Sequence, residues 1–343
     1  MSPKILAAMA AQQGLLTRAQ ALDVGCSPHE IAHLLKTRAW VAVRRGVYAD
    51  AEVWNALEPF RAKPLFEARA ALLAMRRAWV LSHDTAAYAH GLAMLRPAEA
   101  HVHITRPGHT NAWTKYGVKH HLARFTDAQR TEMDGLPTLS MARTVADVGR
   151  EHGFRAGLIT ADSALRAGVP RAEMHEAVGM MTCWPGVTQA RAAIELADVG
   201  AETPVESLAR ELVLSLGFDD VETQFPVQVE GGRVYWADLR VGPHLIEAHG
   251  RTKYVSPDQG GVAQTAAADV LLDERKRERL ITAESLGISN VYWDDFFSGL
   301  AATRVRVREE IEASMRRFGA KPAAHLLENA RRIRAAGDRR AAV

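Results

Sequence analysis

The first fifty residues repeat a short amphipathic pattern that predicts three helices. The first, residues 4–13, ends at Gly14, the second, residues 18–24, ends at Gly25, and the third runs to about Lys36. Thr17 predicts the N-cap of a second helix, and Ser27 predicts the N-cap of a third, with Glu30 placed to complete a capping box. Two β-prone runs follow within residues 40–48, on either side of an Arg-Arg-Gly turn. Three helices and a two-stranded hairpin predict a winged helix-turn-helix over residues 1–52.

The next stretch, residues 60–200, is rich in alanine and in helical periodicity. Helices are expected at residues 64–77, 81–92, 139–148 and 153–168. Residues 101–105 alternate as a strand does, and residues 118–122 are expected to pair with them. This pattern predicts a helix-rich central α/β domain.

Residues 203–300 follow the order helix, three strands, helix, strand. The expected strands are residues 221–229, 234–241, 245–248 and 288–293, and the expected helices are residues 204–216 and 262–286. Residues 301–343 predict a basic helical tail, either a solvated helix face, a disordered end or a phosphate-contacting arm. The chain is therefore expected to be a multidomain α+β protein whose third domain is an α/β sandwich.

The bulk composition argues against several classes of protein. Of the 343 residues, 48% are hydrophobic and 24% are charged, which is ordinary for a globular chain. No run of about 18 apolar residues occurs, so no transmembrane helix is expected. Cys26 and Cys183 are too few for a disulfide framework or a cysteine-based zinc site, and a reducing cytoplasm is the expected location. The net charge of +3 permits nucleic-acid binding without arguing for it.

Basic side chains gather on the third helix and the hairpin of the first module. The expected DNA contacts are His29, His33, Lys36, Arg38, Arg44 and Arg45. Arginine suits bidentate contact with guanine, and basic side chains neutralise phosphates. Two other interpretations remain open, in which the hairpin arginines only solvate a turn or the module docks another protein.

Histidines are frequent in the central domain. His83 and His90 lie two helical turns apart, and the two expected strands carry His101, His103, His120 and His121. We interpret them as packed or capping histidines, because no third ligand with fitting spacing and no supporting acids are apparent, and a zinc site is the alternative.

Asp238 and Glu247 carry the strongest sign of chemistry. They flank a Gly-Pro turn between two apolar runs, and a hairpin of that spacing can bring both carboxylates to one end of the sheet. Two such carboxylates bind a hard cation, Mg²⁺ or Mn²⁺, which suits metal-assisted phosphodiester hydrolysis. The alternative is that both are surface acids without a shared role.

Two families resemble parts of the chain. Residues 4–200 resemble the AbiEi-type antitoxin family, through Gly14-Leu-Leu-Thr-Arg-Ala-Gln-Ala, Trp40-Val-Ala-Val-Arg-Arg-Gly-Val-Tyr48 and Leu81-Ser-His-Asp-Thr-Ala-Ala-Tyr-Ala-His-Gly-Leu92. This resemblance implies a winged helix that binds operator DNA and represses its own operon. It also implies a DNA-associated protein of the bacterial cytoplasm with a partner toxin. A separate hypothesis is that the central domain docks another protein, for instance a toxin.

The third domain resembles the restriction-endonuclease-like fold, in the branch of very-short-patch repair endonucleases. The matching residues are Glu206, Asp238, Glu247-Ala-His-Gly-Arg-Thr-Lys-Tyr254 and Glu274-Arg-Lys-Arg-Glu-Arg279. The resemblance implies that Asp238 and Glu247 bind the metal, with Glu206 as an outer or second-metal ligand. That family has lysine where this chain has His249, so either His249 or Lys253 would activate water. The scissile strand would be held by Arg251, Arg275, Lys276 and Arg277.

Two functions follow from these features. One is sequence-specific binding of double-stranded DNA by an antitoxin-type transcriptional regulator with a silent nuclease-like domain. The other is a Mg²⁺-dependent DNA endonuclease in phage defence or repair, targeted by the winged helix. A homodimer would suit a palindromic DNA site, and no membrane partner is expected.

Overall fold

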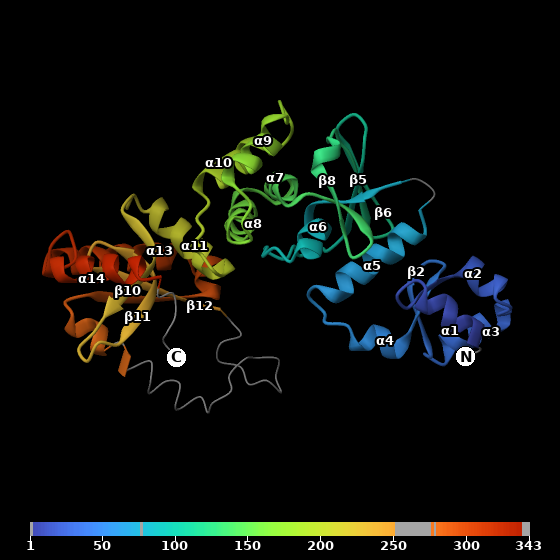
Figure 1. Ribbon diagram of the computed structural model, residues 1–343, viewed down its shortest axis with the longest axis horizontal. Helices are drawn as coiled ribbons and strands as arrows, with labels where there is room; N and C mark the ends of the chain where they lie inside the picture. The colour runs from blue at the N-terminus through green and yellow to red at the C-terminus, as the bar shows by residue number, and fades with distance from the viewer. Residues whose placement is uncertain (1–2, 76–77, 251–275, 278, 338–343) are drawn as a thin grey trace. The chain divides into compact units, whose positions relative to one another are not determined.

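The computed structural model describes residues 3–75, 78–250, 276–277 and 279–337. The chain divides into two compact units, residues 1–197 and residues 198–343. Both units combine helices with strands, so the chain is an α+β protein with several sheets (Figure 1). Within the described ranges, no helix has both the length and the apolar character that crossing a membrane requires.

Three helices and a small sheet open the first unit. The helices are α1 (Pro3–Ala10), α2 (Arg18–Asp23) and α3 (Pro28–Lys36), and the strands are β1 (Leu15–Thr17), β2 (Trp40–Arg44) and β3 (Val47–Asp50), in the sheet order β1-β3-β2. The predicted capping box at the start of α3 forms: the Glu30 amide donates to Ser27 Oγ at 3.2 Å, and the Ser27 amide donates to the Glu30 carboxylate at 2.7 Å. Buried Ile31, Trp40 and Tyr48 fix α3 against the sheet.

A six-stranded mixed sheet follows helices α4 (Ala51–Ala56) and α5 (Ala62–Leu73). Its strands are β4 (Val80–Leu81), β5 (Val102–Arg106), β6 (Asn111–Lys115), β7 (Val118–Leu122), β8 (Arg130–Met133) and β9 (Leu136–Leu139), in the order β6-β7-β5-β4-β9-β8. The predicted pairing of β5 with β7 is confirmed, and it is parallel. Helix α6 (His83–His90) packs against β5 and ends at Gly91, whose φ of 70° suits glycine at a left-handed C-cap.

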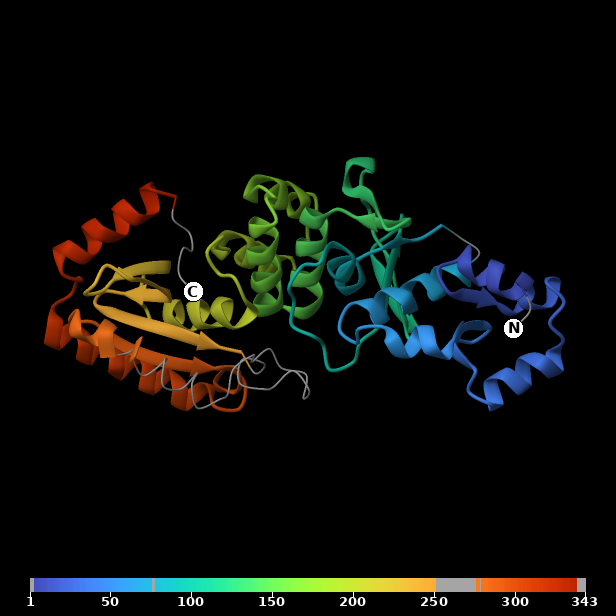
Figure 2. The same ribbon diagram turned by 60° about the horizontal axis from the view of Figure 1, so that its bottom comes forward.

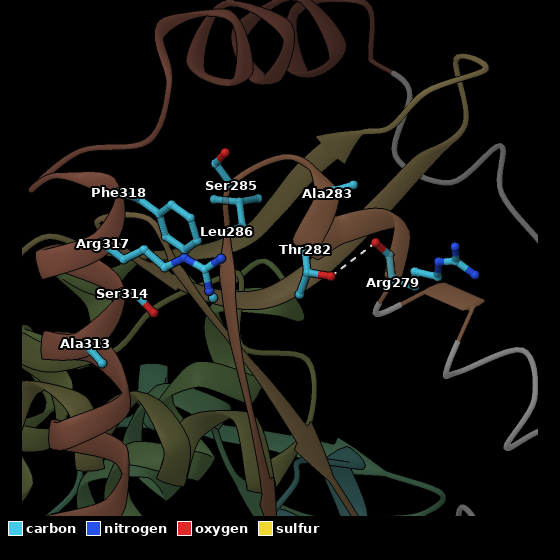
Figure 3. Close-up of a pocket in the computed structure, with 10 residues that line it drawn as sticks. Arg279, Thr282, Ala283, Ser285, Leu286, Ala313, Ser314, Arg317 and Phe318 are labelled. Carbon is cyan, nitrogen blue, oxygen red and sulfur yellow. Dashed lines mark hydrogen bonds between the residues drawn. The ribbon is translucent and has the colours of Figure 1, made fainter.

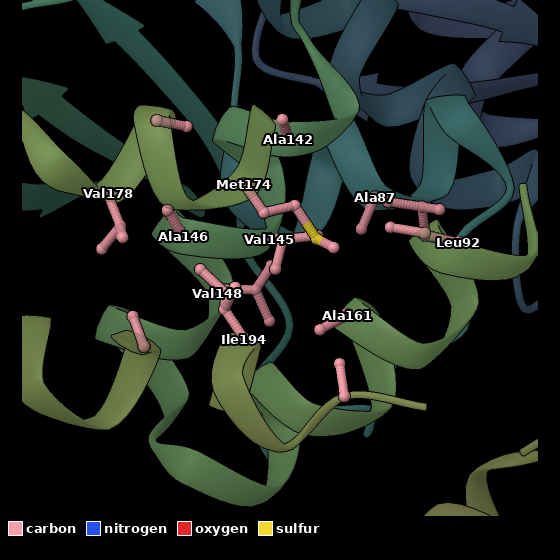
Figure 4. Close-up of a cluster of buried hydrophobic side chains, with 14 of the residues drawn as sticks. Ala87, Leu92, Ala142, Val145, Ala146, Val148, Ala161, Met174, Val178 and Ile194 are labelled. Atoms are coloured by element: carbon pink, nitrogen blue, oxygen red, sulfur yellow. The ribbon is translucent and has the colours of Figure 1, made fainter. Parts of the chain in front are cut away.

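Four helices complete the first unit: α7 (Met141–His152), α8 (Phe154–Arg166), α9 (Arg171–Gly179) and α10 (Val187–Leu196). A short 3₁₀ turn, η1 (Asp127–Gln129), lies before β8. The apolar faces of the four helices meet in one cluster, where Val145, Val148 and Ile194 lie together (Figure 4). Gly157 allows α8 to approach α7 closely, because a Cβ there would lie 2.8 Å from the α7 backbone.

The second unit is built on a four-stranded sheet. Its strands, in sheet order, are β10 (Val221–Gln228), β11 (Val234–Val241), β12 (His244–His249) and β13 (Gly287–Tyr292). Only the β12–β13 pair among these neighbours is parallel. Helix α11 (Pro204–Ser215) packs against the sheet, and residues 276–277 and 279–283 are helical.

The Arg-rich tail belongs to this second unit. After the 3₁₀ turn η4 (Trp293–Phe296), it forms α13 (Leu300–Phe318) and α14 (Ala324–Ala335), drawn in the red end of the colour range beside the strands in Figure 2. Leu326 and Ala330 of α14 join a buried cluster with Phe225 and Leu245 of the sheet. The few apolar side chains of α14 therefore hold the tail against the sheet of the second unit, and the arginines of the tail take no part in that buried cluster.

Candidate functional site

The structure places Asp238 and Glu247 on neighbouring strands of the second unit. The antiparallel register of β11 and β12 pairs Leu239 with Ile246, and one step further along brings Asp238 opposite Glu247. The Asp238 carboxylate also accepts a hydrogen bond from the Ala248 amide at 2.8 Å. These contacts fix the two acids at the end of the hairpin away from its turn.

Glu206 reaches the same region from the first turn of α11. It is only 6% exposed, and its carboxylate accepts from the Thr203 hydroxyl and the Glu202 amide, both at 2.8 Å. Burial and then the neighbouring negative charge of Asp238 raise the pKa of Glu206 to about 7. Two acids from different elements therefore repel each other in a partly desolvated site.

Glu247 already has a positive partner. Arg277 Nη2 donates to Glu247 Oε1 at 2.7 Å and to the carbonyl of Trp236 at 2.8 Å. The sequence assigned Arg277 to the scissile strand, whereas here it neutralises a buried acid. Lys276 is exposed, and Arg251, Lys253 and Arg275 lie outside the described residues.

His249 is held in one orientation at the end of β12. Its Nε2 lies 2.8 Å from Asn290 Oδ1, and its ring stacks on Tyr292 with 5.1 Å between centroids. Asn290 is also the register partner of Glu247 on β13. The ring is thus fixed beside the acids, and its contacts come from a strand that lies about forty residues further along the chain.

Sequence reasoning missed Gln224 and Asn290. The register places Gln224 of β10 opposite Asp238, and its side-chain amide donates to the Glu206 carboxylate at 3.2 Å. Its φ of 49° is unusual for a residue other than glycine, and such backbone strain often accompanies functional sites. Neither residue belongs to a motif, so only the strand register could have revealed them.

The expected DNA contacts of the first unit fall into two groups. His29, His33 and Lys36 are exposed and lie at i, i+4 and i+7 of α3, so they share one helix face. Arg38 and Arg45 are exposed as well. Arg44 differs, because it is half-buried and its Nη2 donates to the carbonyl of Tyr116 in the β6–β7 turn at 2.8 Å.

A second basic feature is an open pocket of about 700 Å³ in the second unit. Arg279 and Arg317 line it, together with Ser285, Ser314 and Phe318 (Figure 3). Figure 3 shows the Arg317 guanidinium directed inward, whereas the Arg279 side chain extends away from it.

Comparison with known proteins adds little to this geometry. No protein-family model matches the chain. It is 30% identical over 130 residues to two proteins of Mycobacterium tuberculosis, named uncharacterized protein MT2308 and uncharacterized protein Rv2248. The match covers 36% of this chain and 48% of each relative, so the chain spans about half the length of the curated relatives it matches. The crystal structure of the RV2827C protein of the same organism is similar over 60% of this chain and 79% of that one, at 15% identity and a TM-score of 0.38.

Proposed function

We propose that the chain is a sequence-specific binder of double-stranded DNA and a transcriptional regulator of the antitoxin type. The observation that carries this proposal is the exposed basic face of α3, formed by His29, His33 and Lys36. The element order α1-β1-α2-α3-β2-β3 supports a winged helix-turn-helix, in which α3 would enter the major groove. Arg38 and Arg45 would neutralise phosphates on either side. Binding of a partner toxin and formation of a homodimer remain predictions from the sequence.

The test compares a variant that removes three exposed positive charges with a variant that removes one half-buried positive charge. The triple variant Lys36→Ala, Arg38→Ala, Arg45→Ala should lose three phosphate contacts, which reduces the slope of log K against log salt by about 2.7, at about 0.9 per contact. Arg44→Ala is the matched control and should leave the slope unchanged, because that guanidinium already binds the Tyr116 carbonyl. Fluorescence anisotropy with a duplex selected from a random pool measures both slopes. Wild-type affinity and slope in the triple variant would refute DNA binding through α3.

A second candidate function is metal-dependent DNA cleavage by the second unit. The electrostatic coupling of Glu206 to Asp238 favours it, because two acids that repel each other gain stability from a shared cation. Carboxylate oxygens are the donors that Mg²⁺ or Mn²⁺ prefers. Asp238, Glu247 and Glu206 would have to move closer together to hold such an ion, because the three-ligand groups within 4.8 Å among the described residues are both histidine-containing ones in the first unit. When bound, such an ion stabilises the charge that develops on the phosphate and lowers the pKa of a bound water. The helix-strand-strand-strand-helix-strand order supports a restriction-endonuclease-like domain.

The protein's own residues would complete that reaction. His249, oriented by Asn290 and Tyr292, would accept a proton from water in the position where the family has lysine.

Plasmid nicking in Mn²⁺, with and without chelator, tests this second function. Cleavage should disappear in Asp238→Asn and persist in Asp219→Asn, a control in which an exposed acid is changed in the same unit. Equal cleavage by both variants would assign the activity elsewhere. Absence of cleavage by the wild type would leave the regulator as the function.

A further inference from the structure

Three buried histidines converge in the first unit, each from a different element. His83 begins α6, His103 lies on β5 and His121 lies on β7, and they are 3%, 2% and 6% exposed. His103 Nδ1 and His121 Nε2 are 3.1 Å apart, and the His83 ring stacks on His121 with 3.9 Å between centroids. Because a nitrogen lone pair lies in the plane of its ring, the His83 ring has to turn out of this stack before it can bind the same ion as His121. One nitrogen of each ring lies within 4.8 Å of the other two.

Neutral imidazole is the form of histidine that binds metals, through the ring nitrogen that keeps its lone pair. Two nitrogens bonded to one tetrahedral Zn²⁺ at about 2.0–2.1 Å would be about 3.3 Å apart, close to the separation of His103 and His121.

The supporting acid that the sequence did not reveal is present in the fold. Asp84 is 1% exposed, and its Oδ2 lies 3.7 Å from His103 Nε2 and has no hydrogen-bond partner among the described residues. Its Oδ1 lies 2.6 Å from Nε2 of His152, the last residue of α7. A carboxylate behind a metal-bound histidine orients the ring and strengthens it as a ligand.

Backbone strain marks the same position. His83 has a φ of 47°, a left-handed conformation that residues other than glycine rarely adopt. Ser82 Oγ lies 3.0 Å from His83 Nδ1 and accepts from the Thr105 hydroxyl at 2.7 Å. When His83 Nδ1 donates to Ser82, the lone pair of the ring lies on Nε2 and is available to a metal.

We propose that His83, His103 and His121 bind one divalent transition-metal ion of the zinc class, with Asp84 and His152 positioning His103. Nitrogen donors select zinc-class ions over Mg²⁺. The ion would tie α6 to β5 and β7, so it would stabilise the first unit. This site is separate in sequence and in chemistry from the carboxylates of the second unit.

The experiment uses untagged full-length protein that has been dialysed against chelator, loaded with Zn²⁺ and passed through a desalting column. Wild type should retain about one Zn²⁺ per chain and take up Co²⁺ with a ligand-field spectrum typical of nitrogen ligands. His121→Gln should abolish both signals. His120→Gln is the matched control on the next residue, whose ring stacks on Trp113 instead, and it should bind as wild type does.

Three further variants separate this site from the alternatives. Asp84→Asn should bind Zn²⁺ about 10–100-fold more weakly, since it loses the group that orients His103. Asp238→Asn should bind normally, because the carboxylates of the second unit take no part. His83→Gln provides a second ligand variant, and circular dichroism checks the fold of each. A wild type that stays metal-free after loading, or equal losses in His120→Gln and His121→Gln, would overturn the proposal.

Discussion

Asp147 balances two guanidinium groups inside the first unit, and removing its charge should be costly. Arg143 Nε lies 2.9 Å from Asp147 Oδ2, and both side chains are fully buried. Arg150 Nη1 lies 3.3 Å from the other carboxylate oxygen, and both arginines lie over the ring of Trp184. The substitution Asp147→Asn keeps the shape and leaves the Arg143 charge buried without a counter-charge.

The expected cost follows from that uncompensated charge. Breaking a buried ion pair by removing one partner destabilises a protein by about 3–5 kcal/mol. That is a large part of the roughly 5–15 kcal/mol that stabilises a typical domain. For a unit of this size, the melting temperature should fall by roughly 6–20 °C, at about 2–4 °C per kcal/mol.

Urea unfolding measures the loss in free energy of unfolding, and hydrogen exchange in peptides from α7 and α8 shows where in the unit it occurs. Asp127→Asn, which changes an exposed acid in the same unit, should stay within about 0.5 kcal/mol of wild type. The double variant Arg143→Met, Asp147→Leu should be more stable than Asp147→Asn, because it removes both charges. A loss below about 1 kcal/mol in Asp147→Asn, or no recovery in the double variant, would refute this reasoning.

Two further predictions concern helix packing and acid stability. Gly157→Ala should cost about 1–3 kcal/mol, because the new Cβ would lie 2.8 Å from the α7 backbone, while Gly179→Ala, with open space around its Cβ, should be close to neutral in the same thermal melt. Burial alone would raise the pKa of Glu222, but hydrogen bonds from Arg334 and Arg240 outweigh it and lower that pKa below 4.5. Its contribution is therefore fully present above pH 4.5 and is lost as the pH falls through the lowered value, so wild type should lose more stability in acid than Glu222→Gln. Equal acid sensitivity in urea melts would contradict this sign.

Local features of the fold could be predicted well. Ser27 and Glu30 lie three residues apart, so their capping box depends on neighbouring backbone alone, and it forms. Strand β1 was not predicted, because its three residues owe their strand conformation to hydrogen bonds with β3, about thirty residues away. The tail was predicted to be helical and basic, but Leu326 and Ala330 gained meaning only when the sheet supplied a surface to bury them.

The candidate sites divide in the same way. The sequence singled out Glu206, Asp238 and Glu247, but it could not show that Arg277 pairs with one of them. The sequence predicted that Arg44 contacts DNA, and in the structure that side chain donates a hydrogen bond to the Tyr116 carbonyl.

The histidines show the physical reason for the difference most clearly. The sequence by itself determined helix ends, strand periodicity and turns, because these depend on residues within about four positions of one another. Only the tertiary structure brought His83, His103 and His121 together with Asp84 and His152, from two helices and two strands. Strand register and helix packing set such distances, and both are decided by burial of apolar surface across the whole unit.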